Sequence, residues 1–340
     1  MSGRACFMLG HDNRMHAIEV AETGGPEVLT SVEKPQPSPG AGEVLIKTEA
    51  IGVNFIDTYF RSGQYPRELP FIPGSEAAGT ITAVGNDVTA VRVGDRVVTA
   101  AALSGTYADL CTAPAWLVAA LPANIDFDVA AAALLKGLTA HYLLTSVYPV
   151  QPGDTVLVHA GAGGVGLIVT QWATSLGARV LTTVSTPAKA ELSRQAGATA
   201  VLEYPGENAA AFGQRIRELT DGAGVAAVYD GVGAATFDAS LASLAIRGTL
   251  VLFGAASGPV PPVDPQRLNS AGSVYLARPT LTHFIRSDQE FAWRAGELLQ
   301  AIDSGLIKVT VSGRYSLADA ARAHRDLEKR KTVGSIVLLP

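Results

Sequence analysis

The feature that most constrains this chain is a glycine-rich turn between an apolar strand and an apolar helix. The strand Asp154-Thr-Val-Leu-Val-His-Ala160 runs directly into Gly161-Ala-Gly-Gly-Val-Gly166, and a helix is predicted from Val165 to Leu176. A lone G-x-G-x-x-G is weak evidence, but here it lies between the strand and the helix that such a turn requires. The segment predicts a dinucleotide-binding α/β unit whose phosphates lie at a helix N-terminus.

Each glycine of the turn is expected to have its own task. Gly161 permits the tight turn, Gly163 lets the backbone approach a pyrophosphate, and Gly166 lets helix and strand pack closely. Gly164 adds conformational latitude, and Val165 begins the helix.

Two different patterns of predicted secondary structure divide the rest of the chain. From Met15 to about Leu121, short strands are broken by Gly and Pro, which predicts a small antiparallel barrel. Its strands are expected at Glu43 to Ala50, Gly79 to Val84, Asp95 to Ala100 and Tyr107 to Thr112. From Asp154 to about Leu276, apolar strands alternate with glycine turns and amphipathic helices, which is typical of a parallel sheet. The parallel strands are expected at Thr155 to His159, Arg179 to Val184, Ala200 to Leu202, Ala226 to Tyr229, Thr249 to Phe253 and Ser273 to Leu276. Helices are expected between them, most clearly at Val165 to Leu176, Pro187 to Ala196, Ala209 to Thr220 and Ala235 to Ala245.

A chain of 340 residues exceeds the size at which one hydrophobic core usually stops growing, so two domains are expected. After Pro279, two helices and a closing strand are predicted to return to the first domain. The expected division is residues 1–136 with 279–340 for a barrel domain, and 137–278 for a nucleotide domain. Residues 1–14 are either a mis-assigned start or an extension.

Composition excludes several other functions. The net charge is −5 and the positive charges are spread along the chain, so a nucleic-acid surface is not expected. We find no run of about 18 apolar residues, and therefore expect no membrane span. Only Cys6 and Cys111 are present, outside any C-x-x-C, which fits a reducing cytoplasm and gives no disulfide framework or cysteine-zinc site.

The end of the second parallel strand indicates which dinucleotide binds. An NAD enzyme usually places Asp or Glu there, on the ribose 2′-hydroxyl. This chain has Ser185-Thr-Pro-Ala-Lys189 instead. A hydroxyl and a lysine at a helix start attract a 2′-phosphate, whereas a carboxylate would repel it. We therefore expect NADP(H), unless Lys189 merely faces water.

The absence of metal-ligand and hydrolase motifs limits the reactions that this chain could catalyse. The six histidines show no metal-ligand spacing, His159 is expected to pack with a backbone hydrogen bond, and no G-x-S-x-G elbow supports hydrolysis. A hydride donor without a metal needs an acceptor that already delocalises negative charge, and a quinone or an enone does so.

Further motifs are spread from about His16 to Pro340. They are Gly24-Gly-Pro-Glu-Val-Leu29, Ile51-Gly-Val-Asn-Phe-Ile-Asp-Thr-Tyr59 with Arg61-Ser-Gly63, Pro73-Gly-Ser-Glu-Ala-Ala-Gly79, Gly94-Asp-Arg-Val97, Leu135-Lys-Gly-Leu-Thr139 and Tyr229-Asp-Gly-Val-Gly233. With the glycine turn they resemble the zinc-free quinone oxidoreductase and zeta-crystallin group of the medium-chain dehydrogenases and reductases. The resemblance implies an α/β protein with a GroES-like β-barrel domain beside a Rossmann doubly wound parallel sheet, acting as a zinc-independent NADPH:quinone oxidoreductase.

The resemblance also implies a site. Asn54 and Ser75 stand where zinc-dependent relatives would carry Cys and His ligands. Asn54, Tyr59, Tyr65 and Lys136 would orient the acceptor and stabilise its oxyanion, while solvent supplies the last proton. Lys136 is alternatively a simple surface charge, Asn54 a loop cap, and the tyrosines packing residues. The expected cofactor contacts are Asn54, Thr139, Gly161, Gly163, Gly164, Val165, Gly166, Ser185, Lys189, Tyr204, Gly231, Gly233, Phe253, Gly254, Arg278 and Arg330.

Two other functions remain open at this point. The same hydride chemistry suits an enone or enoyl-thioester reductase, and the crystallin resemblance allows an NADPH-binding protein with little turnover. Glu203 and Pro205 beside Tyr204 could weaken the preference for NADPH. A homodimer is expected through the edge strand near Ser273 to Leu276, because an exposed apolar edge invites pairing.

Replacing Lys189 with Ala tests the phosphate assignment. The Michaelis constant for NADPH should rise far more than that for NADH, since only NADPH carries the 2′-phosphate. Steady-state kinetics with both cofactors measures this, and an equal change in both would remove Lys189 from the phosphate site.

Overall fold

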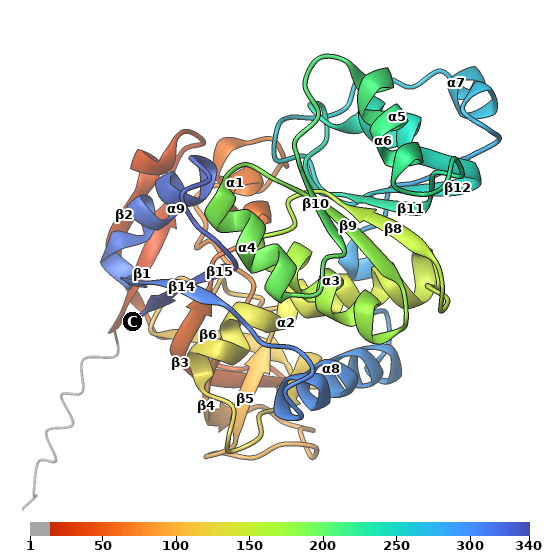
Figure 1. Ribbon diagram of the computed structural model, residues 1–340. Helices are drawn as coiled ribbons and strands as arrows, with labels where there is room; N and C mark the ends of the chain where they lie inside the picture. The colour runs from red at the N-terminus through yellow and green to blue at the C-terminus, as the bar shows by residue number, and fades with distance from the viewer. Residues whose placement is uncertain (1–13) are drawn as a thin grey trace, which may run out of the picture.

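The computed structural model describes residues 14–340, and it divides them between two large β-sheets with helices around them (Figure 1). The expectation that residues 1–14 are a mis-assigned start or an extension concerns residues 1–13, which lie outside the described residues. The green and cyan half of Figure 1 carries a six-stranded sheet, and the red, orange and dark blue half carries a seven-stranded one.

The six-stranded sheet is parallel, with strand order β10-β9-β8-β11-β12-β13. Alternate residues of its strands enter two different cores. Val156 and Val158 pack with Trp172 and other apolar side chains on one face, while Leu157 packs with Phe212 on the other. Burial on both faces is what the continuous apolar runs of these strands require. The strands are β8 (Thr155–Val158), β9 (Arg179–Val184), β10 (Ala200–Glu203), β11 (Val225–Asp230), β12 (Leu244–Leu252) and β13 (Tyr275–Ala277).

All six expected parallel strands are present, and the largest boundary error is at β12. We expected a helix to Ala245 and a strand only from Thr249, but β12 already begins at Leu244. The strand includes Arg247 in the left-handed region, with a φ of 61°, and the β11–β12 register shifts between Val225 and Ala227. Such an irregularity interrupts the period-2 pattern, which is why the sequence did not indicate the early start.

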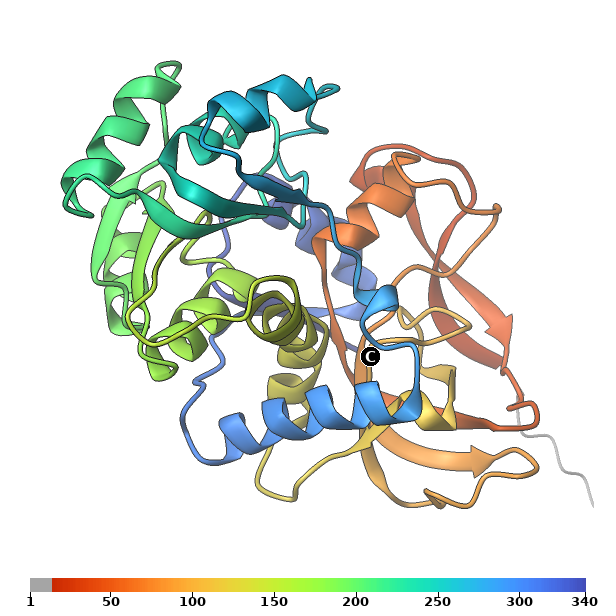
Figure 2. The same ribbon diagram turned by 90° about the vertical axis from the view of Figure 1, so that its right-hand side faces the viewer.

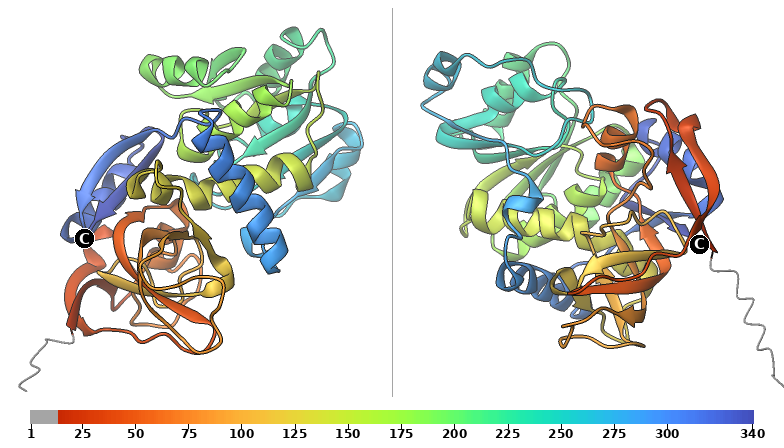
Figure 3. Two further views of the ribbon diagram at one scale, coloured as in Figure 1. Left: turned by 90° about the horizontal axis from the view of Figure 1, so that it is seen from below. Right: turned by 180° about the vertical axis from the view of Figure 1, so that it is seen from behind.

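The second sheet combines segments from both ends of the chain, which are red to orange and dark blue in Figure 3. Its order is β14-β15-β3-β4-β5-β7, with β6 also paired to β3. The expected strand at 107–112 begins three residues later, and β14 was not expected. A separate hairpin, β1-β2, completes this half. The strands are β1 (Arg14–Val20), β2 (Leu29–Pro35), β3 (Glu43–Gly52), β4 (Ala77–Val84), β5 (Arg96–Thr99), β6 (Leu110–Pro114), β7 (Val118–Ala120), β14 (Val311–Ser316) and β15 (Ser335–Leu339).

Helix α2 (Phe127–Tyr142) joins the two halves. It contacts β3, β4 and β5 of one sheet as well as α3 (Gly164–Ser175) of the other half. Together with a π-helical turn it covers residues 127–147, which are long and apolar enough to cross a membrane by length and composition alone. We expected no such run, but 78% of its most apolar window is buried in this fold, as a core helix requires.

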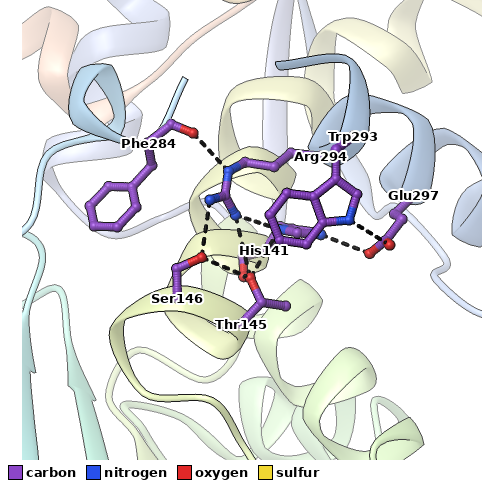
Figure 4. A network of polar contacts seen from close by, with 7 residues as sticks. All are labelled: His141, Thr145, Ser146, Phe284, Trp293, Arg294 and Glu297. Carbon is purple, nitrogen blue, oxygen red and sulfur yellow. Dashed lines mark hydrogen bonds and ion pairs between the residues drawn. The ribbon is translucent and has the colours of Figure 1, made fainter. Parts of the chain in front are cut away.

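A buried polar network holds α2 against α8 (Asp288–Asp303), which runs beside it in Figure 2. His141 of α2 lies between Arg294 and Glu297 of α8 (Figure 4). Because Arg294 can only donate, Nδ1 of His141 must accept, and Nε2–H donates to Glu297 at 2.8 Å. Burial lowers the pKa of His141, which favours this neutral form.

The remaining helices lie at the outside or between the strands. They are α1 (Phe55–Ser62), α4 (Pro187–Gln195), α5 (Ala209–Glu218), α6 (Phe237–Ser243), α7 (Pro265–Ser270) and α9 (Ala320–Glu328). Helix α1 was not expected, because its polar and aromatic residues occupy only two turns.

The close packing of α3 on β8 depends on Gly166. A Cβ at this position would lie 2.2 Å from the backbone oxygen of Ala160, which cannot move aside. Gly166→Ala should therefore destabilise the protein by on the order of 2 kcal/mol. Gly296→Ala is the matched control, since nothing lies within 4 Å of its added Cβ on the exposed side of α8. It should stabilise by about 0.5 to 1 kcal/mol. Denaturant unfolding of both variants measures this, and equal behaviour would contradict the packing argument.

Candidate functional site: the junction of the two sheets

The dinucleotide turn differs in one detail from the expected division of tasks. The left-handed residue is Ala160, with a φ of 55°, rather than a glycine. Gly161 is required for another reason, because its Cβ would lie 2.5 Å from Cβ of Thr182 on the neighbouring strand. Gly163 is the N-cap of α3, and a Cβ there would meet atoms of Ala160 alone, its carbonyl oxygen at 3.2 Å and its Cβ at 3.9 Å. That open side suits the close approach of a phosphate to the free N–H groups of the helix.

Gly164 makes room for a side chain of the other half. Its Cβ would lie 2.6 Å from Cδ of Lys136 and 2.9 Å from Oγ of Ser335. Lys136 thus passes directly over the first residue of α3. Val165, the next residue, is half-buried and packs against the core around α2.

The residues expected at the 2′-phosphate lie together at the edge of this junction. Nζ of Lys189, in α4, donates to the backbone oxygen of Arg330 at 2.7 Å. Burial lowers the pKa of Lys189, and the charge of Arg330 lowers it further. Burial raises the pKa of Tyr204, and the same arginine opposes that rise. Ser185 is exposed at the end of β9.

The ends of β11 and β12 explain several of the remaining glycines. A Cβ on Gly231 would lie 2.8 Å from the ring of Phe253, and one on Gly254 would lie 2.5 Å from the Gly231 oxygen. Gly233 has a φ of 91°. These residues pack against one another, so the two strand ends form one surface. Asp230 stabilises it by accepting hydrogen bonds from Val232 N, Gly233 N, Thr236 and Ser240.

His159 has the packing role that we expected of it, although its partners are side chains. It is buried and bonds to Thr183 and Ser240 at 2.8 and 3.0 Å. Its ring is stacked near Tyr204, with 6.5 Å between centroids. His159 therefore supports a residue of the expected phosphate site from behind.

Helix α1 brings the acceptor-side residues to the dinucleotide sheet. The hydroxyl of Tyr59 accepts a hydrogen bond from the backbone N–H of Ala255, just after β12, at 3.1 Å. Tyr65 lies edge-on to Tyr59, with centroids 5.2 Å apart, and accepts from Arg278 at 3.2 Å. Residues far apart in the sequence thus meet in one place.

Thr139 uses its hydroxyl within its own helix. Its Oγ1 donates to the Leu135 carbonyl at 2.8 Å, and the residue is buried. In the described structure the hydroxyl hydrogen is therefore already engaged, and a contact to a cofactor would use the acceptor lone pairs of the oxygen or the methyl group.

Asn54 and Lys136 share a buried carboxylate that we did not single out. Glu76 is fully buried, accepts from Asn54 Nδ2 at 2.8 Å and from Leu135 N at 2.7 Å, and lies 3.5 Å from Lys136 Nζ. Lys136 is itself 7% exposed, so the reading of it as a surface charge is wrong. The signal was present in the sequence, since Glu76 belongs to the Gly74-Ser-Glu segment already noted.

A second buried carboxylate, Asp57, lies one helical turn after Asn54 and accepts its backbone N–H at 2.8 Å. Tyr107 donates to Asp57, and His324 Nε2 donates to Tyr107 at 2.9 Å, because Nδ1 of His324 must accept from Arg61. Arg61 is also paired with Glu328. Burial raises the pKa of Asp57 to about 7 and lowers that of His324 to about 3.

No group of three or more His, Cys, Asp or Glu side chains within residues 14–340 could hold a metal ion. Where zinc-dependent relatives would carry ligands, this chain presents the amide of Asn54 and the hydroxyl of Ser75. The donor set therefore does not fit zinc.

Two family models match this chain: the alcohol dehydrogenase GroES-like domain over residues 40–123, and the zinc-binding dehydrogenase over residues 164–301. The second model's description includes zinc, and the residues described above depart from it in that respect.

Individual relatives match almost the whole chain. A quinone oxidoreductase of Pseudomonas aeruginosa is 47% identical, over 95% of this chain and 99% of its own. Escherichia coli quinone oxidoreductase, solved with NADPH, is 45% identical with a TM-score of 0.92, covering 96% of this chain and all of that one. A mycobacterial protein, also solved with NADPH, is 72% identical with a TM-score of 0.94 and the same coverage. The chain belongs to the quinone oxidoreductase family of the medium-chain dehydrogenases and reductases.

Proposed function

We propose that this protein is an NADPH-dependent, zinc-independent quinone reductase. The relatives support the reaction, since those named quinone oxidoreductases match the chain from end to end. The observation that carries the proposal is the contact of Tyr59 with Ala255, which joins the acceptor-side helix to the end of the dinucleotide sheet. A reductase needs this proximity because its hydride moves only between atoms in close contact.

The cofactor assignment rests on the two ends of the junction. Lys189, Tyr204 and Arg330 would hold the 2′-phosphate, and the N-terminus of α3 at Gly163 the pyrophosphate. NADPH, when bound, supplies a hydride from its nicotinamide ring. The other proposed contacts are Asn54, Thr139, Gly161, Gly164, Val165, Gly166, Ser185, Gly231, Gly233, Phe253, Gly254 and Arg278.

The acceptor is proposed to lie against Asn54, Tyr59, Tyr65 and Lys136. Their hydroxyl, amide and ammonium groups are hydrogen-bond donors that can stabilise negative charge on an oxygen. A quinone spreads that charge over a conjugated ring, so fixed donors suffice without a Lewis acid.

The division into residues 1–136 with 279–340 and 137–278 remains part of the proposal, and its first boundary falls inside α2. A cytoplasmic location is likewise proposed, on the cysteine usage of the sequence.

The function is tested by measuring NADPH oxidation with a panel of quinones and a panel of enones. We expect turnover with quinones, a higher kcat/KM for NADPH than for NADH, and no loss of activity after treatment with a zinc chelator. Exclusive turnover of enones would instead identify an enone reductase. Tight NADPH binding in calorimetry without any oxidation would identify a binding protein.

We also propose a homodimer that forms through β13, the edge strand of the parallel sheet. Two exposed apolar side chains lie at this end of the sheet: Tyr275 of β13 is 61% exposed, and Ile246 of the neighbouring strand β12 is 79% exposed. An uncovered edge of this kind favours pairing with a second copy.

Ile246→Glu should shift the protein toward the monomer, since it places a charge in the proposed interface. Val93→Glu is the matched control, because Val93 is an exposed valine outside the parallel sheet. Light scattering at micromolar concentration reads the mass of each variant. A monomeric wild type, or an equal effect of both substitutions, would reject this interface.

A further inference from the structure

The ammonium group of Lys136 is a buried donor without an acceptor. Its Nζ has no hydrogen-bond partner, and the nearest carboxylate oxygen, on Glu76, lies 3.5 Å away. A buried donor left without a partner destabilises the folded protein, and a charged donor does so more strongly than a neutral one. In a folded protein such a group requires an explanation.

The residues around Lys136 determine where its ammonium group can donate a hydrogen bond. The stem of Lys136 is confined by Gly164 and Ser335, at the start of the dinucleotide helix. Glu76, its ion-pair partner, already accepts from Asn54 and from Leu135 N. Rotation of the terminal carbon–nitrogen end needs no movement of the stem, and donors in ligand-free sites often tighten only when the substrate binds. The unused N–H groups thus lie beside Asn54, between the cofactor turn and the acceptor side.

We propose that Lys136, rather than solvent, is the proton donor to the reduced acceptor, an inference that rests on the proposed quinone reductase function. Hydride transfer converts the quinone into a hydroquinone monoanion. One N–H bond of the ammonium then breaks, and its proton forms an O–H bond with the oxyanion. The electron pair of that bond stays on Nζ as a neutral amine. Hydroquinone and the oxidised dinucleotide are the products, and a proton from water restores the ammonium.

The charges around Lys136 favour that restoration. Glu76 and Asp57 are both buried close to Lys136, and the charges of these three groups interact. With Lys136 neutral, the buried carboxylate of Glu76 would lose the cation that lies 3.5 Å from it. The other groups around Asp57 are Tyr107, which donates to it, and Arg67, whose charge interacts with it. The raised pKa of Asp57, about 7, reflects its burial and the neighbouring carboxylate.

Chemical rescue tests the proposal. Lys136→Ala should lower kcat/KM for a quinone by about 10²-fold or more, which is the usual contribution of general acid catalysis. Added primary ammonium ions should restore the rate in proportion to their concentration, with more acidic ions more effective. Tetramethylammonium carries the same charge without a transferable proton and should not restore it. Equal rescue by tetramethylammonium, or no rescue by any ion, would overturn the proposal.

Controls separate this result from other failures. Lys308→Ala removes an exposed lysine outside the site and should neither lose activity nor respond to ammonium ions. If Lys136→Ala does not fold, the double variant Lys136→Ala/Glu76→Gln removes both buried charges and undergoes the same test. If the wild type oxidises NADPH with none of the quinones tested, the proposed function is refuted. If the wild type is active but ammonium ions do not rescue Lys136→Ala, only the role of Lys136 is refuted.

A second readout does not depend on turnover. The phenolate oxygen of 4-nitrophenol mimics the oxyanion, and its absorbance distinguishes phenolate from phenol. We expect the wild type to bind the phenolate in preference to the phenol, and Lys136→Ala to lose that preference. Identical spectra with both proteins, shifted or not, would contradict an ammonium facing the acceptor oxygen.

Discussion

The contact of helix α2 with both sheets is the constraint on which the site depends. Apolar residues of this helix pack on β3, β4 and β5 and on α3 within one continuous core, so its position is determined by both halves of the molecule at once. Lys136 projects from the same helix and therefore reaches both the dinucleotide turn and Glu76. Because protein interiors are close-packed, a helix held in this way moves little, and the distance between its two neighbours is fixed with it.

The electrostatics of the junction follow from burial. Two carboxylates and one ammonium lie out of contact with water, where charge interactions are stronger than at the surface. Each carboxylate is held by at least one backbone N–H, Leu135 N for Glu76 and Asn54 N for Asp57. The chain from Arg61 through His324 and Tyr107 has a single direction of donation toward Asp57, because a guanidinium cannot accept. This side of the site is consequently rigid, and Lys136 is the charged group in it with donors to spare.

The glycine turn shows how a motif and its structural reasons can differ. The motif predicted a turn at the right place and a helix N-terminus free for phosphate. The left-handed conformation, however, belongs to Ala160. Gly161 is required because a Cβ at this position would clash with Thr182 of β9. Gly164 is needed by Lys136, which comes from a segment nearly thirty residues earlier. The spacing of glycines in one segment predicts the conformation of that segment. Which neighbouring residue leaves no room for a Cβ depends on how distant segments pack in the fold.

By itself, the sequence determined the six parallel strands, the dinucleotide turn and the family, because hydrophobic periodicity and the motifs are local and each is read within a few residues. Through the family resemblance it also made Asn54, Tyr59 and Lys136 candidates for the acceptor side of the site, which remains a prediction. Only the tertiary structure decided that Lys136 is buried beside Glu76, that Tyr59 contacts Ala255, and that Asp57 ends a buried chain from Arg61. The physical reason is that burial and the pairing of charges depend on which distant segments pack together, and a single sequence carries no direct record of those contacts.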